Sequence, residues 1–160
     1  MVALYAHCAF APDGRAPSID TPLHGLVDKP CVDHMHPDAV IAIAACADSR
    51  ALAREIYGDE IGWLPWVRPG FELGVRLQKF ASEHPEARGV ILEAHGLFTW
   101  GDSDREAYET TLDVINRAIA WLEAKAPNTR PFGASAAAAL PQSERRALAA
   151  ALMPLSLIHI

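Results

Sequence analysis

The sequence predicts a mixed α/β domain, because short apolar β segments alternate with helical segments along most of the 160 residues. The clearest strand is residues 89–94, a β-branched and apolar run of the kind found in buried strands. The clearest helix spans residues 103–125, where a capping-box pattern precedes apolar residues at helical spacing: Tyr108, Leu112, Ile115, Ile119 and Leu122.

Composition limits the kind of protein. With 160 residues, the chain is long enough for one globular domain but not for two large ones. Its 51% hydrophobic and 21% charged residues are typical of a globular protein. The net charge of −6 and the absence of clustered Lys and Arg argue against a nucleic-acid partner. No apolar run reaches the roughly 18 residues of a membrane helix, and the first ten residues lack the pattern of a signal peptide. We therefore expect no membrane partner.

Cysteine usage bears on the cellular compartment. The three cysteines are an odd number without CxxC spacing, which indicates neither a disulfide framework nor a zinc knuckle. This usage favours a reducing, cytoplasmic setting.

The first part of the chain is apolar and then loop-like over residues 1–16, with a turn expected at residues 12–14. Residues 17–24 form a loop or a helix start, in which Asp20 or Thr21 serves as the N-cap and Pro22 takes the first helical position. A capping role is the simplest interpretation of Asp20.

The other elements follow from periodicity, Pro and Gly. Residues 37–47 read as an alanine-rich helix, although Val40, Ile41 and Ile43 would also suit a strand. The remaining predicted elements are strands at residues 31–35, 61–67 (interrupted by Pro65) and 97–100, and helices at residues 49–57 (ended by Gly58) and 70–84.

The chain divides at residue 126 by composition. Residues 1–126 carry the predicted domain, and residues 127–160 form a Pro- and Ala-rich linker to residue 141 followed by a short helix at residues 142–153.

The motif Asp33-His34-Met35-His36-Pro37 is the first candidate for chemistry. In an extended segment the side chains of His34 and His36 project to the same side, which suits metal binding. A catalytic zinc takes three protein ligands, and His95, at the end of the buried strand, is the third candidate. The alternative is that two of seven histidines fall at this spacing by chance and form structural hydrogen bonds.

Three motifs together resemble the class II aldolase/adducin family over roughly residues 1–125. They are Ser18-Ile19-Asp20-Thr21-Pro22-Leu23-His24, then the motif from Asp33 extended to Val40, and Glu93-Ala94-His95-Gly96-Leu97-Phe98-Thr99-Trp100-Gly101-Asp102. The likeness is greatest to the aldolase half of bifunctional rhamnulose-1-phosphate aldolase/short-chain dehydrogenase proteins.

This resemblance implies a three-layer α/β/α fold with a mixed, mostly antiparallel central sheet and a metal at the sheet's edge. It implies that His34, His36 and His95 bind Zn²⁺, and that the subunits form a homotetramer. The family begins with strands and a Gly-Asn-containing phosphate loop that residues 1–17 do not supply, and no GxGxxG motif of a dehydrogenase half is present. We therefore expect a fragment that is truncated at its N-terminus.

The resemblance also assigns roles near the metal. Asp20 stands where the family has a Glu that acts as acid/base or fourth ligand, and Ser18 matches a serine that contacts substrate phosphate. Glu93 is the second-choice carboxylate. His24 is expected either to support a residue of the site or to be structural, fixing a neighbour by a hydrogen bond. Asp33 either orients a ligand or caps the next helix.

The expected reaction is retro-aldol cleavage of a ketose 1-phosphate, rhamnulose 1-phosphate, to dihydroxyacetone phosphate and lactaldehyde. The metal would act as a Lewis acid and stabilise the enediolate that C–C cleavage leaves. Epimerisation or dehydration of a sugar phosphate on the same scaffold is the first alternative. A non-catalytic adducin-like interaction module is the second, although such relatives are expected to lose the histidines that this chain retains.

Overall fold

The computed structural model describes residues 2–9, 11, 14, 17–126 and 139–157. These residues belong to two compact units, one within residues 1–126 and one within residues 127–160, and each is described by itself. Among the helices of the described residues, none is long and apolar enough to cross a membrane.

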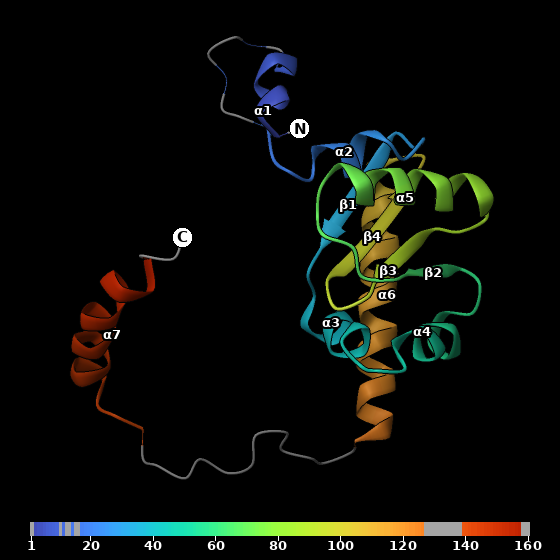
Figure 1. The fold of residues 1–160 in the computed structure, drawn as a ribbon. Coiled ribbons are helices and arrows are strands. Elements are labelled where there is room, and N and C mark those ends of the chain that lie inside the picture. The colour runs from blue at the N-terminus through green and yellow to red at the C-terminus, as the bar shows by residue number, and fades with distance from the viewer. Residues whose placement is uncertain (1, 10, 12–13, 15–16, 127–138, 158–160) are drawn as a thin grey trace. The chain divides into compact units, whose positions relative to one another are not determined.

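A four-stranded sheet forms the centre of the larger unit (Figure 1). Its strands are β1 (Cys31–Met35), β2 (Ile61–Leu64), β3 (Gly89–Leu92) and β4 (Gly96–Gly101), in the order β1-β4-β3-β2. Strand β4 is antiparallel to both of its neighbours, whereas β2 and β3 are parallel. The sheet is thus mixed and mostly antiparallel, as predicted.

Helices cover both faces of the sheet and make three layers (Figure 1). On one face lie α2 (Thr21–Gly25) and α5 (Phe71–Glu83). On the other face lie α3 (Asp38–Ala44), α4 (Ser49–Tyr57) and α6 (Asp104–Lys125). The alternation of side chains along β4 divides the core between the faces: Leu97 packs toward α3 and α6, and Phe98 toward α2 and α5.

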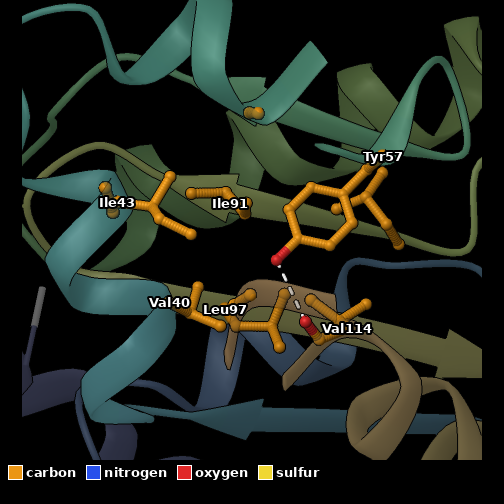
Figure 2. Close-up of a cluster of buried hydrophobic side chains, with 10 residues drawn as sticks. Val40, Ile43, Tyr57, Ile91, Leu97 and Val114 are labelled. Carbon is orange, nitrogen blue, oxygen red and sulfur yellow. Dashed lines mark hydrogen bonds between the residues drawn. The ribbon is translucent and has the colours of Figure 1, made fainter. Parts of the chain in front are cut away.

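The core on the α3, α4 and α6 side contains one buried phenol (Figure 2). Tyr57 is 2% exposed, and its hydroxyl donates a 3.0 Å hydrogen bond to the carbonyl of Val114. Burial raises the pKa of Tyr57 to about 12, so the phenol stays protonated and able to donate. Aliphatic side chains from α3, the sheet and α6 surround it, including Val40, Ile43, Ile91 and Leu97.

Local sequence signals set most of the element ends. The Ser103 hydroxyl accepts the Glu106 N–H at 3.2 Å, as the capping box predicts, while the Glu106 carboxylate accepts the Asp102 N–H at 2.8 Å. Gly58 ends α4 with a left-handed φ of 64°. The strand predicted at residues 61–67 stops at Leu64, because Pro65 cannot donate to a ladder.

The ambiguous segment at residues 37–47 is a helix. In α3 the side chains of Val40, Ile43 and Ala44 are all buried, which is the i, i+3, i+4 spacing of a helix rather than the alternation of a strand.

Two terminal regions differ from the predictions. Within the loop-like residues 1–16, Val2–Tyr5 forms the short helix α1 and Ala6–Cys8 the 3₁₀ helix η1. In the smaller unit α7 (Gln142–Leu157) continues beyond the predicted end at residue 153. Most of the predicted linker, residues 127–138, lies outside the described residues.

Candidate metal centre

Three histidines meet at one end of the sheet because of how the strands pair. His34 is in β1, and His36 follows the last residue of that strand. Because β1 and β4 are antiparallel, the end of β1 lies beside the start of β4, where Met35 pairs with Leu97. His95 immediately precedes β4, in the short turn that connects β3 to β4.

The three imidazoles are close enough to hold one ion. One ring nitrogen from each of His34, His36 and His95 lies within 4.8 Å of the other two. The ring centroid of His34 lies 4.5 Å from that of His36 and 5.2 Å from that of His95. The ring centroids of His36 and His95 are 5.1 Å apart. The spacing predicted from the sequence is therefore present as a cluster in space.

The ring of His34 is fixed from two sides. Its Nδ1 donates a 3.0 Å hydrogen bond to the carbonyl of Leu97, and the ring stacks on Phe98 at a centroid distance of 4.0 Å and an interplanar angle of 7°. With the proton on Nδ1, the lone pair of Nε2 is free to bind an ion. This Nε2 is buried, and no hydrogen-bond partner for it lies among the described residues.

A divalent cation fits this donor set. An unpartnered buried nitrogen is costly unless it binds something, and imidazole Nε2 is a common metal ligand. Burial, followed by the neighbouring His36 and His95, lowers the pKa of His34, although its bond to Leu97 opposes the shift. Burial and then His36 lower the pKa of His95. Both shifts favour the neutral form, which is the form that coordinates a metal.

Gly96 makes room for His36. A Cβ at Gly96 would lie 2.5 Å from His36 Cδ2 and 2.8 Å from the carbonyl oxygen of Met35. Real side chains are not accommodated at such distances. The glycine after His95 is therefore required by the approach of the second histidine.

The turn that carries His95 contains a strained residue. Ala94 has a φ of 50°, in the left-handed region that side chains disfavour. Its N–H donates to Ala44 O at 2.9 Å, and the N–H of His95 donates to Leu92 O at 3.1 Å. These two bonds hold the turn, and with it His95, against α3 and β3.

Asp20 occupies the N-cap position of α2, but its side chain makes no capping hydrogen bond. Its charge raises the pKa values of His34 and His95, so the carboxylate lies within electrostatic range of both. The hydroxyl of Ser18 accepts the Asp20 N–H at 3.1 Å and lies 3.5 Å from Asp20 Oδ2. The simple capping interpretation thus fails for the Asp20 side chain, and Ser18 and Asp20 form one exposed to half-buried pair.

The other candidate residues have structural partners. His24 Nδ1 donates to Val32 O at 3.0 Å, in line with the expected structural role. Asp33 accepts from the Thr111 hydroxyl at 3.4 Å. Among the described residues, its side chain makes no capping bond to α3 and no hydrogen bond to a histidine. Glu93, the second-choice carboxylate, accepts the backbone N–H of Trp66 at 2.8 Å.

Sequence reasoning missed three contributors to the centre: Gly96, the carbonyl of Leu97 and the ring of Phe98. Each depends on the pairing of β1 with β4, in which His34 stands opposite Phe98. The adjacent motif His95-Gly96 was a signal for the first of them, because a glycine beside a ligand often marks a close approach.

Comparison with known proteins agrees with this fold. Residues 2–122 match the family model of the class II aldolase and adducin N-terminal domain. YuxG of Bacillus subtilis (strain 168), an uncharacterized oxidoreductase, is 34% identical over 154 residues, which are 96% of this chain and 22% of YuxG. The chain thus spans about a fifth of the length of that curated relative.

Solved structures show the same architecture. The N-terminal class II aldolase domain of a conserved protein from Thermoplasma acidophilum superposes with a TM-score of 0.69 at 28% identity, covering 76% of this chain and 55% of that one. A sugar-phosphate aldolase from Thermotoga maritima shares the fold, with a TM-score of 0.62, 17% identity and coverage of 75% and 59%. With more than half of its residues matched by the family model, the chain belongs to the class II aldolase and adducin N-terminal domain family.

Proposed function

We propose that this chain is the metal-binding domain of a class II aldolase that cleaves a ketose 1-phosphate, and that the metal is zinc. The observation that carries the proposal is the convergence of three imidazoles around the buried, unpartnered Nε2 of His34. Membership of the family and the fold shared with a sugar-phosphate aldolase support it.

His34, His36 and His95 would hold the ion. Three neutral ligands leave a divalent cation its full charge, and such an ion, when bound, acts as a Lewis acid that stabilises an enediolate. The bond from His34 Nδ1 to Leu97 keeps the ligand nitrogen aimed at the site. The stacked ring of Phe98 excludes water from one side of His34.

Asp20 is the residue we assign to proton transfer. Its carboxylate is not used in capping, and its charge acts on two of the three histidines. In the reaction it would remove the proton of the substrate hydroxyl as the C–C bond breaks. Ser18, whose exposed hydroxyl adjoins Asp20, would donate a hydrogen bond to the substrate phosphate.

The substrate we propose is rhamnulose 1-phosphate, with dihydroxyacetone phosphate and lactaldehyde as products. We further propose that the domain belongs to a larger cytoplasmic protein with a dehydrogenase half, and that it works as a homotetramer. The greater length of YuxG and its description as an oxidoreductase support a larger parent.

Elemental analysis of the purified chain tests the metal first. We expect about one zinc per chain, as for a mononuclear site of three histidines. The variants His34→Ala and His36→Ala should lose it, whereas His84→Ala, at an exposed histidine outside the cluster, should keep it. A folded chain that binds no divalent metal would overturn the proposal.

The second test is cleavage of rhamnulose 1-phosphate by the zinc-loaded chain, followed by the appearance of dihydroxyacetone phosphate. Asp20→Asn should abolish cleavage while zinc remains bound. Formation of an epimer or a dehydrated sugar instead would refute the aldolase reaction and identify one of the alternative reactions of this scaffold.

A further inference from the structure

The loop of residues 65–70 lies at the same end of the sheet as the candidate metal centre. It follows β2 directly, as the turn containing His95 follows β3. Because β2 and β3 are parallel, with Leu64 paired to Leu92, their carboxyl ends are side by side. The loop and the turn therefore leave the sheet next to each other.

Glu93 joins the turn to the end of β2 and to the loop by one hydrogen bond each. Its backbone N–H donates to Leu64 O at 2.9 Å, and its Oε2 accepts the Trp66 N–H at 2.8 Å. Pro65 has no N–H, so the regular ladder cannot continue at this point. The side chain of Glu93 supplies the next bond in its place, two residues before His95.

The far end of the loop lies near the segment that carries the proposed acid/base. Gly70 has a φ of 134° and is buried; a Cβ built on it would lie 3.7 Å from Ile19 Cγ1, in ordinary contact. Ile19 lies between Ser18 and Asp20. One end of the loop is thus hydrogen-bonded to Glu93, two residues before His95, and the other end lies near Ile19, next to Asp20.

Between its two ends the loop carries an exposed aromatic side chain and an exposed cationic side chain. Val67 packs against the core beneath α2 and α5, whereas Trp66 is 58% exposed and Arg68 is also exposed. In an extended segment Trp66 and Arg68 fall on the side opposite Val67. Arg68 has no ion-pair partner in the part of the chain that the structure describes.

We propose that Trp66 and Arg68 form a recognition wall for an anionic sugar derivative, and that Glu93 is the positioning residue that holds this wall beside the metal centre. A guanidinium binds a phosphate through two parallel hydrogen bonds, and an aromatic ring packs on the apolar face of a sugar. The inference rests on the proposed function and deepens it, since it assigns recognition of the substrate's phosphate and carbon chain.

The test is binding of dihydroxyacetone phosphate, and of uncharged dihydroxyacetone, to the zinc-loaded full chain by titration calorimetry. Arg68→Ala should lower the affinity for dihydroxyacetone phosphate about tenfold, as expected for a lost hydrogen bond to a charged group. The affinity for dihydroxyacetone should not change. Arg145→Ala, at an exposed arginine of α7, is the control for the loss of one positive charge.

Glu93 is tested by a pair of variants. Glu93→Gln keeps a side-chain oxygen that can accept the Trp66 N–H. The affinity of this variant for dihydroxyacetone phosphate should therefore stay within about twofold of the parent's. Glu93→Ala removes the acceptor and should lower the affinity for dihydroxyacetone phosphate several-fold without loss of zinc. If Glu93 had only a structural role, Glu93→Ala would lower the stability of the chain but leave the affinity of the folded, zinc-loaded chain for dihydroxyacetone phosphate unchanged.

The outcomes separate this inference from the proposed function. A parent chain without zinc refutes the proposed function itself. A zinc-loaded parent that binds no dihydroxyacetone phosphate, or that binds it equally well after Arg68→Ala and Glu93→Ala, overturns the recognition wall alone.

Discussion

Replacing Gly96 by Ala is the sharpest test of the metal centre, because it leaves all three histidines in place. The backbone of Gly96 is not left-handed, so alanine adds no conformational strain of its own. The only new feature is a methyl group that would lie 2.5 Å from His36 Cδ2 and 2.8 Å from Met35 O.

The size of the effect follows from these distances. To reach the 3.4 Å at which ordinary contact begins, the ring of His36 must move by about 0.9 Å, whereas metal–ligand distances tolerate only about 0.2 Å. We therefore expect metal affinity to fall about 10- to 100-fold, the range seen when the support of a ligand is lost. Overpacking against the Met35 carbonyl should also lower the free energy of unfolding by about 1–3 kcal/mol.

Competition with a chromogenic chelator measures the affinity, and urea unfolding of the metal-free chain measures stability. Gly25→Ala is the matched control, since a Cβ at Gly25 meets nothing within 4 Å. If Gly96→Ala bound zinc as tightly as Gly25→Ala, His36 would not be held at the centre by this close approach, and the reasoning would fail.

Two further predictions concern stability. Tyr57→Phe removes the buried hydrogen bond to Val114 and should lower the free energy of unfolding, measured with urea, by about 1 kcal/mol. Tyr108→Phe, at an exposed ring, should cause no measurable change. Equal effects of the two substitutions would contradict this prediction. The paired guanidinium of Arg117, and then that of Arg88, lower the pKa of Glu60. Because the folded-state pKa is depressed, the pairing stabilises the fold above the ordinary value of 4.5 and is lost as pH falls through the folded-state pKa. Glu60→Gln should therefore flatten the acid limb of the stability profile, and Glu123→Gln, at an exposed site, should leave it unchanged; a parent-like acid limb in Glu60→Gln would refute the assignment.

Between residues 17 and 126, local patterns determined the helices and strands to within a few residues, whereas they missed the two short helices at Val2–Tyr5 and Ala6–Cys8. The capping signal at Ser103, the glycine after Tyr57 and the proline after Leu64 act within one turn or one strand, so their effects can be read from neighbouring residues. The same applies to His34 and His36, because alternation over two residues is a local property of extended backbone. The family resemblance likewise came from short motifs, and it agreed with the three-layer fold.

The assembly of the centre was decided by tertiary structure. Strand pairing is not local: only the register of β1 against β4 brings His95 to the other two histidines, places Phe98 under His34 and leaves no free space for a side chain at Gly96. The choice of hydrogen-bond partner for a carboxylate is not local either. Glu93 bonds to Trp66, and Asp33 bonds to Thr111, because those groups arrive from distant segments. The sequence named the residue types that the chemistry needs, and the packing of the sheet determined which of them meet.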